Sequence, residues 1–242
     1  MKVGIIQSNY IPWRGYFDFI DSVDLFVFYD DLQYTTRDWR NRNRIVAPEG
    51  MRWLTVPVNY EKRSQLIDEV PIDYSQAWAQ RHLNQLETNY RRAPFFQTYV
   101  HDFTSIISQK FSSISELNVA LCKWIMQILD IRTPTLMSRE VKASGRKSER
   151  LVDFVTRVGG TTYLSGPSAA AYLDVELFQR HGIHVEFKSY DYPAYPQFRG
   201  GFCGEASILD LLFNTGPDAR HYLKSCTPDR IVAGSIPDPQ LV

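Results

Sequence analysis

A short, uninterrupted apolar stretch near the N-terminus constrains the fold more than any other feature of the chain. Residues Leu25 to Tyr29 read LFVFY between Asp24 and Asp30, which is the length of one strand. A strand with apolar side chains on both faces belongs to a sheet that is covered on both sides, as parallel sheets in α/β proteins are. The stretch therefore predicts an α/β fold with a mostly parallel sheet and flanking helices.

The residues before this stretch fit the same architecture. Val3 to Gln7 reads as a short buried strand, and Arg14 to Ile20 has the apolar spacing of a helix face. About a dozen residues between two strands are enough for a short crossover helix, which parallel pairing requires. The chain is thus expected to begin with a strand, a loop, a helix and a second strand.

The rest of the chain contributes a hairpin, several helices and further strands. Trp53–Val58 and Leu66–Val70 are β-like and are interpreted as a hairpin, with Pro57 at an edge. Helices are expected over residues 76–89, 95–110, 115–129, 144–158 and 207–214, with another through Tyr172 and Phe178, and strands over residues 133–137, 161–164 and 183–190. We interpret residues 1–242 as a single α/β domain with an inserted hairpin and helical subdomain at about residues 50–130.

The charge and the cysteine content of the chain indicate which partners and which cell compartment to expect. The formal net charge is 0, so nothing in the overall charge indicates a nucleic-acid partner. Cys122, Cys203 and Cys226 are far apart and form no CxxC pair, which argues against a disulfide framework and against a zinc site. The N-terminal residues do not read as a signal peptide, and no apolar run is long enough for a membrane span. We expect a cytoplasmic protein without a metal.

The stretch from Asp30 to Arg44, DDLQYTTRDWRNRNR, is the strongest candidate for a ligand-binding segment. Guanidinium groups pair with phosphate or carboxylate oxygens, and asparagine amides suit sugar hydroxyls. Ligands of parallel α/β sheets bind just beyond the carboxyl ends of the strands, which is where this stretch begins. The alternative is that it forms a solvated turn. The substrate-binding candidates here are Gln33, Arg40, Asn41, Arg42, Asn43 and Arg44.

The loop after the first strand should lie beside this stretch, because the carboxyl ends of neighbouring parallel strands meet at one edge of the sheet. It adds four substrate-binding candidates, Gln7, Asn9, Tyr10 and Trp13. Asp30 and Asp31 would orient hydroxyl groups or an amine, and we take them as candidate catalytic residues.

Ser165 and Ser168 stand in a tight turn between a predicted strand and a predicted helix. The N-terminus of a helix attracts anions through its free amides and its dipole, so both serines are further candidates for substrate binding. The alternative is that Ser168 is only an N-cap, a position that serine favours.

His82 is the candidate general base. Trp78, His82 and Leu86 recur four residues apart, which places the histidine in an apolar helix stripe. Histidine is the usual base near neutral pH, and partial burial would keep it unprotonated. The alternative is a core histidine with one hydrogen bond.

Motifs spread along nearly the whole chain make it resemble the WbqC-like family of bacterial proteins, which is named from surface-polysaccharide gene clusters. The stretches that carry the resemblance are residues 4–20, 26–45, 53–58, the helix with His82, and residues 89–96, 145–151, 163–174 and 207–217. The resemblance implies a role in modifying sugars or related amines in polysaccharide or secondary-metabolite biosynthesis. Of the reactions it allows, we favour acyl or aminoacyl transfer to an amino sugar.

Residues 12–20 also resemble, more faintly, the strand, loop and helix of adenylylating nucleotidyltransferases. Trp13, Gly15 and Tyr16 stand where those enzymes carry a His-x-Gly-His pattern, so the imidazoles of that chemistry are missing. The first hypothesis is therefore an acyltransferase that takes a carrier-protein or CoA thioester as donor and a nucleotide-linked or free amino sugar as acceptor. The alternatives are a non-catalytic sugar- or nucleotide-binding module and a nucleotidyl-transfer enzyme.

Overall fold

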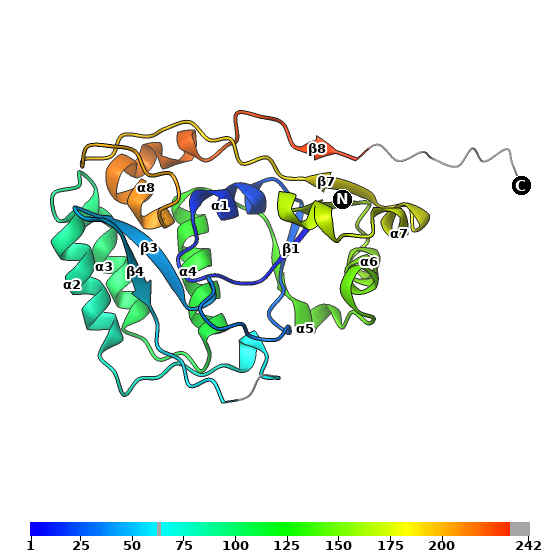
Figure 1. The fold of residues 1–242 in the computed structure, drawn as a ribbon, viewed down its shortest axis with the longest axis horizontal. Helices are drawn as coiled ribbons and strands as arrows, with labels where there is room; N and C mark the ends of the chain where they lie inside the picture. The colour runs from blue at the N-terminus through cyan, green and yellow to red at the C-terminus, as the bar shows by residue number, and fades with distance from the viewer. Residues whose placement is uncertain (62–63, 233–242) are drawn as a thin grey trace, which may run out of the picture.

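The computed structural model describes residues 1–61 and 64–232, and it is built around a six-stranded sheet (Figure 1). The strand order is β5-β2-β1-β6-β7-β8. The first five strands pair in parallel and β8 pairs antiparallel to β7. The strands are β1 (Lys2–Ile6), β2 (Leu25–Phe28), β5 (Thr135–Met137), β6 (Thr162–Ser165), β7 (His184–Phe187) and β8 (Arg230–Ile231). The predicted fold class, an α/β protein with a mostly parallel sheet, is confirmed.

Both faces of the sheet are covered, which explains why β2 is apolar throughout. Phe26 and Phe28 point into the larger core cluster, whereas Val27 and Tyr29 point into the smaller one. Successive side chains of a strand point to opposite faces, so a strand between two cores needs apolar residues at every position. β1 needs a glycine as well. A Cβ at Gly4 would lie 2.4 Å from a ring atom of Phe19 in α1 (Arg14–Asp21), so only glycine allows this helix to approach the strand.

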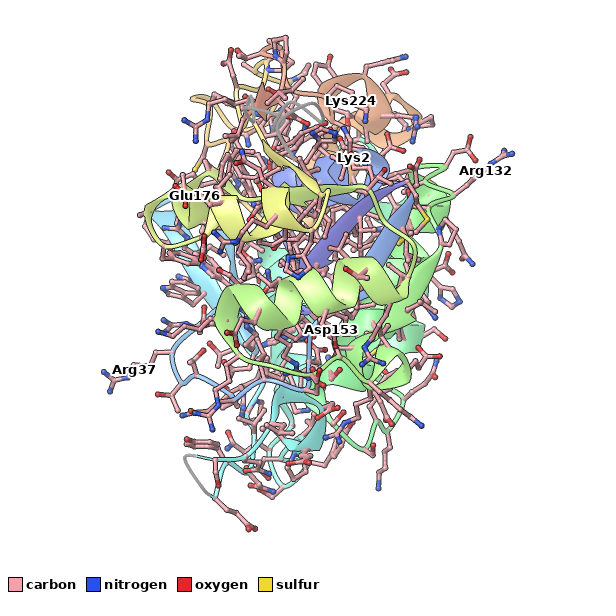
Figure 2. The ribbon with its side chains drawn as sticks, turned by 90° about the vertical axis from the view of Figure 1, so that its right-hand side faces the viewer. Lys2, Arg37, Arg132, Asp153, Glu176 and Lys224 are labelled. Atoms are coloured by element: carbon pink, nitrogen blue, oxygen red, sulfur yellow. The ribbon has the colours of Figure 1, made fainter. Side chains whose placement is uncertain are left out.

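The two helical layers occupy different parts of the molecule. The helices α6 (Lys147–Arg157) and α7 (Val175–Arg180) supply the smaller core through Phe154, Val155 and Phe178. Figure 2 shows α6 lying across this side of the sheet, with Asp153 on the helix. The larger core lies on the opposite face and includes α1, α8 (Ile208–Thr215) and the long segment between β2 and β5.

The segment between β2 and β5 contains a hairpin and three α-helices, which gather with α8 at one end of the molecule (Figure 1). Its elements are β3 (Arg42–Ala47), β4 (Gly50–Thr55), the 3-10 helix η1 (Ile67–Glu69), and the helices α2 (Trp78–Tyr90), α3 (Phe96–Ile107) and α4 (Ile114–Ile128). The helices lie where the sequence predicted them, within a few residues. The division of the chain into domains stays a prediction.

The predicted strand pairing of the hairpin is wrong. β4 pairs with β3, which precedes it, and Leu66–Val70 contains η1 instead of a strand. Residues 62 and 63, between the two predicted strands, lie outside the described residues. The sequence did not predict β3, because one of the three inward-facing positions of this strand is the polar residue Asn43. With a polar residue among Asn43, Ile45 and Ala47, the stretch lacks the clear apolar alternation of a half-buried strand. Arg42 and Arg44 therefore lie in a strand and not in a loop.

The helix predicted through Tyr172 and Phe178 is two separate pieces. The 3-10 helix η2 (Pro167–Ala171) ends before Tyr172, and α7 starts after Asp174, whose side chain accepts a hydrogen bond from the Leu177 amide. The short helices α5 (Ser138–Val141) and η3 (Gly216–Tyr222) complete the fold. Within residues 1–61 and 64–232, no helix has the length and apolar character needed to cross a membrane.

Candidate functional site

A cleft of about 400 Å³ opens beyond the carboxyl end of β1. The strand order reverses beside β1, since the chain first adds β2 and β5 on one side and later β6 and β7 on the other. Such a reversal is where open α/β sheets bind ligands. The loop after β1, the segment before β3, β3 itself and the segment before α8 supply the lining residues, which are Asn9, Pro12, Trp13, Trp39, Asn43, Arg44 and Glu205.

Trp13 forms one wall of the cleft. It precedes α1 as the N-cap residue, and its backbone pairs with Ser207 in an antiparallel bridge that ties the starts of α1 and α8 together. Its indole lies against Gly15, where a Cβ would be 2.4 Å from the ring, and it meets Tyr190 edge-on at 5.2 Å between centroids. The indole is therefore held in place before any ligand binds.

Asn43 of β3 holds the loop after β1 in its conformation through side-chain hydrogen bonds. Its Nδ2 donates to the carbonyl oxygens of Tyr10 at 3.1 Å and Ile11 at 3.0 Å. Ile11 has a φ of 38°, a left-handed conformation that is unusual for a β-branched residue and is held here by these bonds. The backbone amide of Tyr10 donates to the Trp39 carbonyl at 3.0 Å, which joins the loop to the segment before β3.

Arg40 stabilises the same loop through hydrogen bonds of its guanidinium. Its guanidinium donates to the carbonyl of Ser8 at 3.3 Å, to the side-chain oxygen of Asn9, and to the Gln7 side chain at 3.4 Å. It also lies 3.5 Å from the Asp38 carboxylate. Arg40 and Gln7 thus support the floor of the cleft, while Asn9 also lines it.

Arg44 and Glu205 form the charged rim. Arg44 Nη2 lies 2.8 Å from Glu205 Oε2, and the Glu205 side chain is 75% exposed. The Nε of Arg44 is buried and has no hydrogen-bond partner among the described residues. The rim therefore offers a carboxylate and part of a guanidinium to a ligand.

The outer face of the hairpin continues from the cleft. Trp39 lies 5.4 Å from Trp53 between ring centroids, and both indoles are about two-fifths exposed. The guanidinium of Arg42 lies 4.2 Å over the Trp53 ring, and that of Arg44 lies 5.5 Å from each indole. Arg42 therefore lies beside the cleft and not in its lining.

Asp30 lies at the end of β2 but is completely buried. Its carboxylate accepts from the Ser8 amide at 2.7 Å and from the Ser115 hydroxyl. Burial raises the pKa of Asp30, and the bonds from Ser115 and Ser8 oppose that rise. This carboxylate joins β2, the loop after β1 and α4, and it does not reach the cleft lining.

Asp31 points to the opposite layer. Its carboxylate pairs with Arg150 of α6, and its backbone amide donates a hydrogen bond to the Ser138 hydroxyl at 3.3 Å. Arg150 lies over the Tyr29 ring at 5.2 Å. The structure therefore separates Asp31 from both Asp30 and the cleft lining.

His82 is buried between α2 and the hairpin, with 3% of its surface exposed. Nδ1 lies 2.9 Å from the Tyr10 hydroxyl and Nε2 lies 3.0 Å from the Thr55 carbonyl. Since a carbonyl only accepts, Nε2 carries the proton and Nδ1 accepts from Tyr10. Burial lowers the pKa of His82 to about 4. Both ring nitrogens are engaged, which favours the core interpretation over the general base.

The remaining candidates lie apart from the cleft. Asn41 is buried and donates to the Val56 carbonyl at 2.8 Å, which supports the end of β4. Gln33 is exposed and bridges Leu66. Ser165 is buried at the end of β6, whereas Ser168 is exposed inside η2, whose N-cap position belongs to Gly166. The structure thus brings together Asn9, Trp13, Asn43 and Arg44 of the predicted residues.

Sequence reasoning missed three lining residues, Pro12, Trp39 and Glu205. Trp39 had a signal, since an indole among arginines in a polar stretch has little reason to be there for packing alone. Glu205 had none, because it meets Arg44 across 161 positions of sequence. Among residues 1–61 and 64–232, no three His, Cys, Asp or Glu side chains gather in a way that could hold a metal ion.

Comparison with known proteins shows to which family the chain belongs. The pattern of the WbqC-like protein family matches residues 7–222, which include every lining residue of the cleft. The chain belongs to the WbqC-like family. It is 45% identical over 228 residues to the uncharacterized protein Rv1507c of Mycobacterium tuberculosis (strain ATCC 25618 / H37Rv), a match that covers 93% of this chain and 98% of that protein. No solved structure matches the chain.

Proposed function

We propose that this WbqC-like protein is a transferase that binds an anionic amino sugar in the cleft and transfers an acyl or aminoacyl group to its amine. The observation that carries the proposal is the lining itself, which combines two indoles, the amide of Asn9, a guanidinium and a carboxylate in one hollow. Indole faces stack on sugar rings, amides bond hydroxyl groups, and a guanidinium pairs with a negatively charged substituent.

Glu205 is the residue to which we assign the substrate amine. Its carboxylate stands at the rim beside Arg44 and is largely exposed, so it could hold an ammonium group and then accept the proton. The sequence suggested His82, Asp30 and Asp31 for this chemistry, but each of these side chains is engaged outside the lining.

The donor we propose is a thioester of CoA or of a carrier protein. The amine nitrogen would attack the thioester carbonyl carbon, a carbon–nitrogen bond would form, and the carbon–sulfur bond would break. Glu205 would take one proton from the ammonium group so that the neutral amine can attack, and the second proton of the attacking nitrogen would pass to the departing sulfur, which leaves as a thiol. No metal is needed for this balance of atoms.

A thermal-shift screen followed by a thiol-release assay tests the proposal. Amino sugars and nucleotide-linked amino sugars should raise the melting temperature in proportion to the logarithm of their concentration. With an acyl-CoA donor and the amino sugar that stabilises most, free thiol should appear only when both substrates are present. Stabilisation by ATP with magnesium alone would instead favour nucleotidyl transfer.

Glu205→Gln is the decisive variant, and Glu176→Gln is its matched control. Glu176 is an exposed glutamate on α7, at the other end of the molecule from the hairpin (Figure 1). Loss of a general base typically lowers the rate about 10²- to 10⁴-fold, so Glu205→Gln should do so while Glu176→Gln leaves the rate unchanged. An equal rate in the two variants would refute the role of Glu205.

The second candidate is a non-catalytic sugar- or nucleotide-binding module. The burial of Asp30 and His82, with both side chains already hydrogen-bonded, favours it. Amino-sugar binding without thiol release from any thioester donor, including one attached to a carrier protein, would support this candidate against the transferase.

A further inference from the structure

The outer face of the β3–β4 hairpin carries an unusual set of side chains for a protein surface. Arg44 lies opposite Trp53 in the strand register, and Arg42 lies two residues before Arg44, so all three share one face. Trp39 joins them from the segment before β3. We call these four side chains, Trp39, Arg42, Arg44 and Trp53, the indole–guanidinium platform.

The platform exposes the ring surfaces of two indoles. Trp53 is 40% exposed and Trp39 is 39% exposed, although the inward-facing Leu54 and Ile45 of the same hairpin are fully buried. Two neighbouring half-exposed indoles are a surface on which a flat ring can stack. The guanidinium carbon of Arg42 lies 4.2 Å from the Trp53 ring centroid, and guanidinium groups also stack on bases.

Only one of the two arginines of the platform has an ion-pair partner within the described residues. Arg42 forms no ion pair there; its Nη2 donates to the Arg37 carbonyl, and its buried Nε has no partner. Arg44 has Glu205 as its ion-pair partner, but its Nε is also without a hydrogen bond. Arg37 adds a third positive charge that projects from the edge of the molecule (Figure 2). A neutral sugar ring would leave these groups uncompensated, whereas phosphate groups would pair with them.

We propose that the indole–guanidinium platform binds the base and diphosphate of a nucleoside diphosphate whose attached sugar occupies the cleft. The inference rests on the proposed function for the sugar end of the ligand and adds the chemical class of its other end. Trp39 and Arg44 belong to both surfaces, since they line the cleft and contact Trp53. The base would stack on the exposed part of the Trp53 indole beside the Arg42 guanidinium, and the diphosphate would pair with Arg42 and Arg44.

The test compares nucleoside diphosphates with inorganic pyrophosphate by isothermal titration calorimetry. UDP, ADP, GDP and dTDP share the diphosphate with pyrophosphate and differ from it by the nucleoside. At least one of the four should bind about tenfold tighter than pyrophosphate, because a base stacked on an aromatic ring usually strengthens binding by about fivefold to a hundredfold. Equal affinity of pyrophosphate and all four nucleotides would overturn the proposal.

Substitutions at Trp53 then assign the base to this ring. Trp53→Ala should remove the advantage of the nucleotide and leave the affinity for pyrophosphate unchanged, whereas Trp53→Phe keeps a flat ring and should retain most of it. Arg42→Ala should weaken both ligands by about tenfold or more, the usual effect of losing one charge-assisted contact. Tyr172→Ala, at another strongly exposed aromatic residue, is the control and should change neither affinity.

The alternative is that the four side chains only stabilise the hairpin through cation–π contacts. In that case Trp53→Ala would lower the melting temperature while the ratio of the two affinities stayed constant, and the proposal would be wrong. The outcome of these nucleotide-binding experiments can be distinguished from the outcome of the transferase test. Nucleotide binding that depends on Trp53 can be present when Glu205→Gln has no effect on turnover, and it can be absent when amino-sugar acylation is observed.

Discussion

Replacing His82 with glutamine should destabilise the protein most at neutral pH and progressively less as the solution is acidified. His82 bridges Tyr10 in the loop after β1 and Thr55 in β4, and it is almost completely buried. A glutamine side chain cannot span both partners in the same geometry, so one buried polar group loses its bond. At about pH 7 the cost should be about 1–3 kcal/mol in the free energy of unfolding.

The pH dependence follows from the lowered pKa of His82. Burial lowers this pKa to about 4, compared with about 6.5 in an unfolded chain. Below about pH 6.5 the unfolded state binds a proton that the folded state does not, so the stability supplied by a neutral His82 is present above that pH and is lost as the pH falls toward 4. Between about pH 7 and about pH 5 the loss amounts to about 2 kcal/mol.

Urea denaturation of the wild type and the variant at these two pH values measures the effect. The difference in free energy of unfolding between the two proteins should shrink by about 2 kcal/mol from about pH 7 to about pH 5. Carboxylates titrate equally in both proteins and cancel. His101→Gln, at an exposed position on α3, is the control and should show no such change. A difference that does not depend on pH would mean that His82 is accessible to protons in the folded state and would restore it as a candidate base.

Three further substitutions test the fold around the site. Gly4→Ala should lower the free energy of unfolding by about 1–3 kcal/mol in urea titrations, because the added Cβ would meet the Phe19 ring at 2.4 Å. Asp18→Asn should cost about 3 kcal/mol in thermal denaturation, since the fully buried Asp18 carboxylate lies 2.9 Å from the ammonium of Lys188, which would keep only Asp229. Trp53→Phe, which keeps a flat ring on the hairpin, should change the free energy of unfolding by less than about 1 kcal/mol, since cation–π contacts at exposed sites contribute no more than that. A larger loss would indicate that the platform serves hairpin stability.

The family and the architecture were readable from local sequence. The run from Leu25 to Phe28 had to lie between two cores because it carries apolar side chains at every position, and that requirement depends only on the alternation of a strand. The carboxyl-end rule then predicted that the loop after β1 and the segment after β2 would meet, and Arg40 does join them through Gln7 and Asn9.

The sequence did not reveal which polar residues line the cleft and which support the fold. Arg40, Arg42 and Arg44 look alike in the chain, yet Arg40 supports the loop after β1, Arg42 covers Trp53 and Arg44 lines the cleft. Arg40 precedes β3, whereas Arg42 and Arg44 share the outer face of that strand. Arg44 differs from Arg42 because it lies opposite Trp53 and pairs with Glu205, a residue far away in the sequence. Strand pairing and a distant contact that no local pattern revealed therefore decided the role of each arginine.

By itself, then, the sequence determined the two-sided parallel sheet and the segments at its carboxyl edge, because apolar periodicity acts over a few residues and needs no partner. Only the tertiary structure decided which polar groups remain available. In the folded protein the Asp30 carboxylate is hydrogen-bonded to Ser115. The His82 ring is hydrogen-bonded to the Tyr10 hydroxyl and to the backbone carbonyl of Thr55. The tertiary structure also brought Glu205 to Arg44 across 161 positions. Burial and pairing are set by contacts between elements far apart in the chain, and those contacts exist only after the chain has folded.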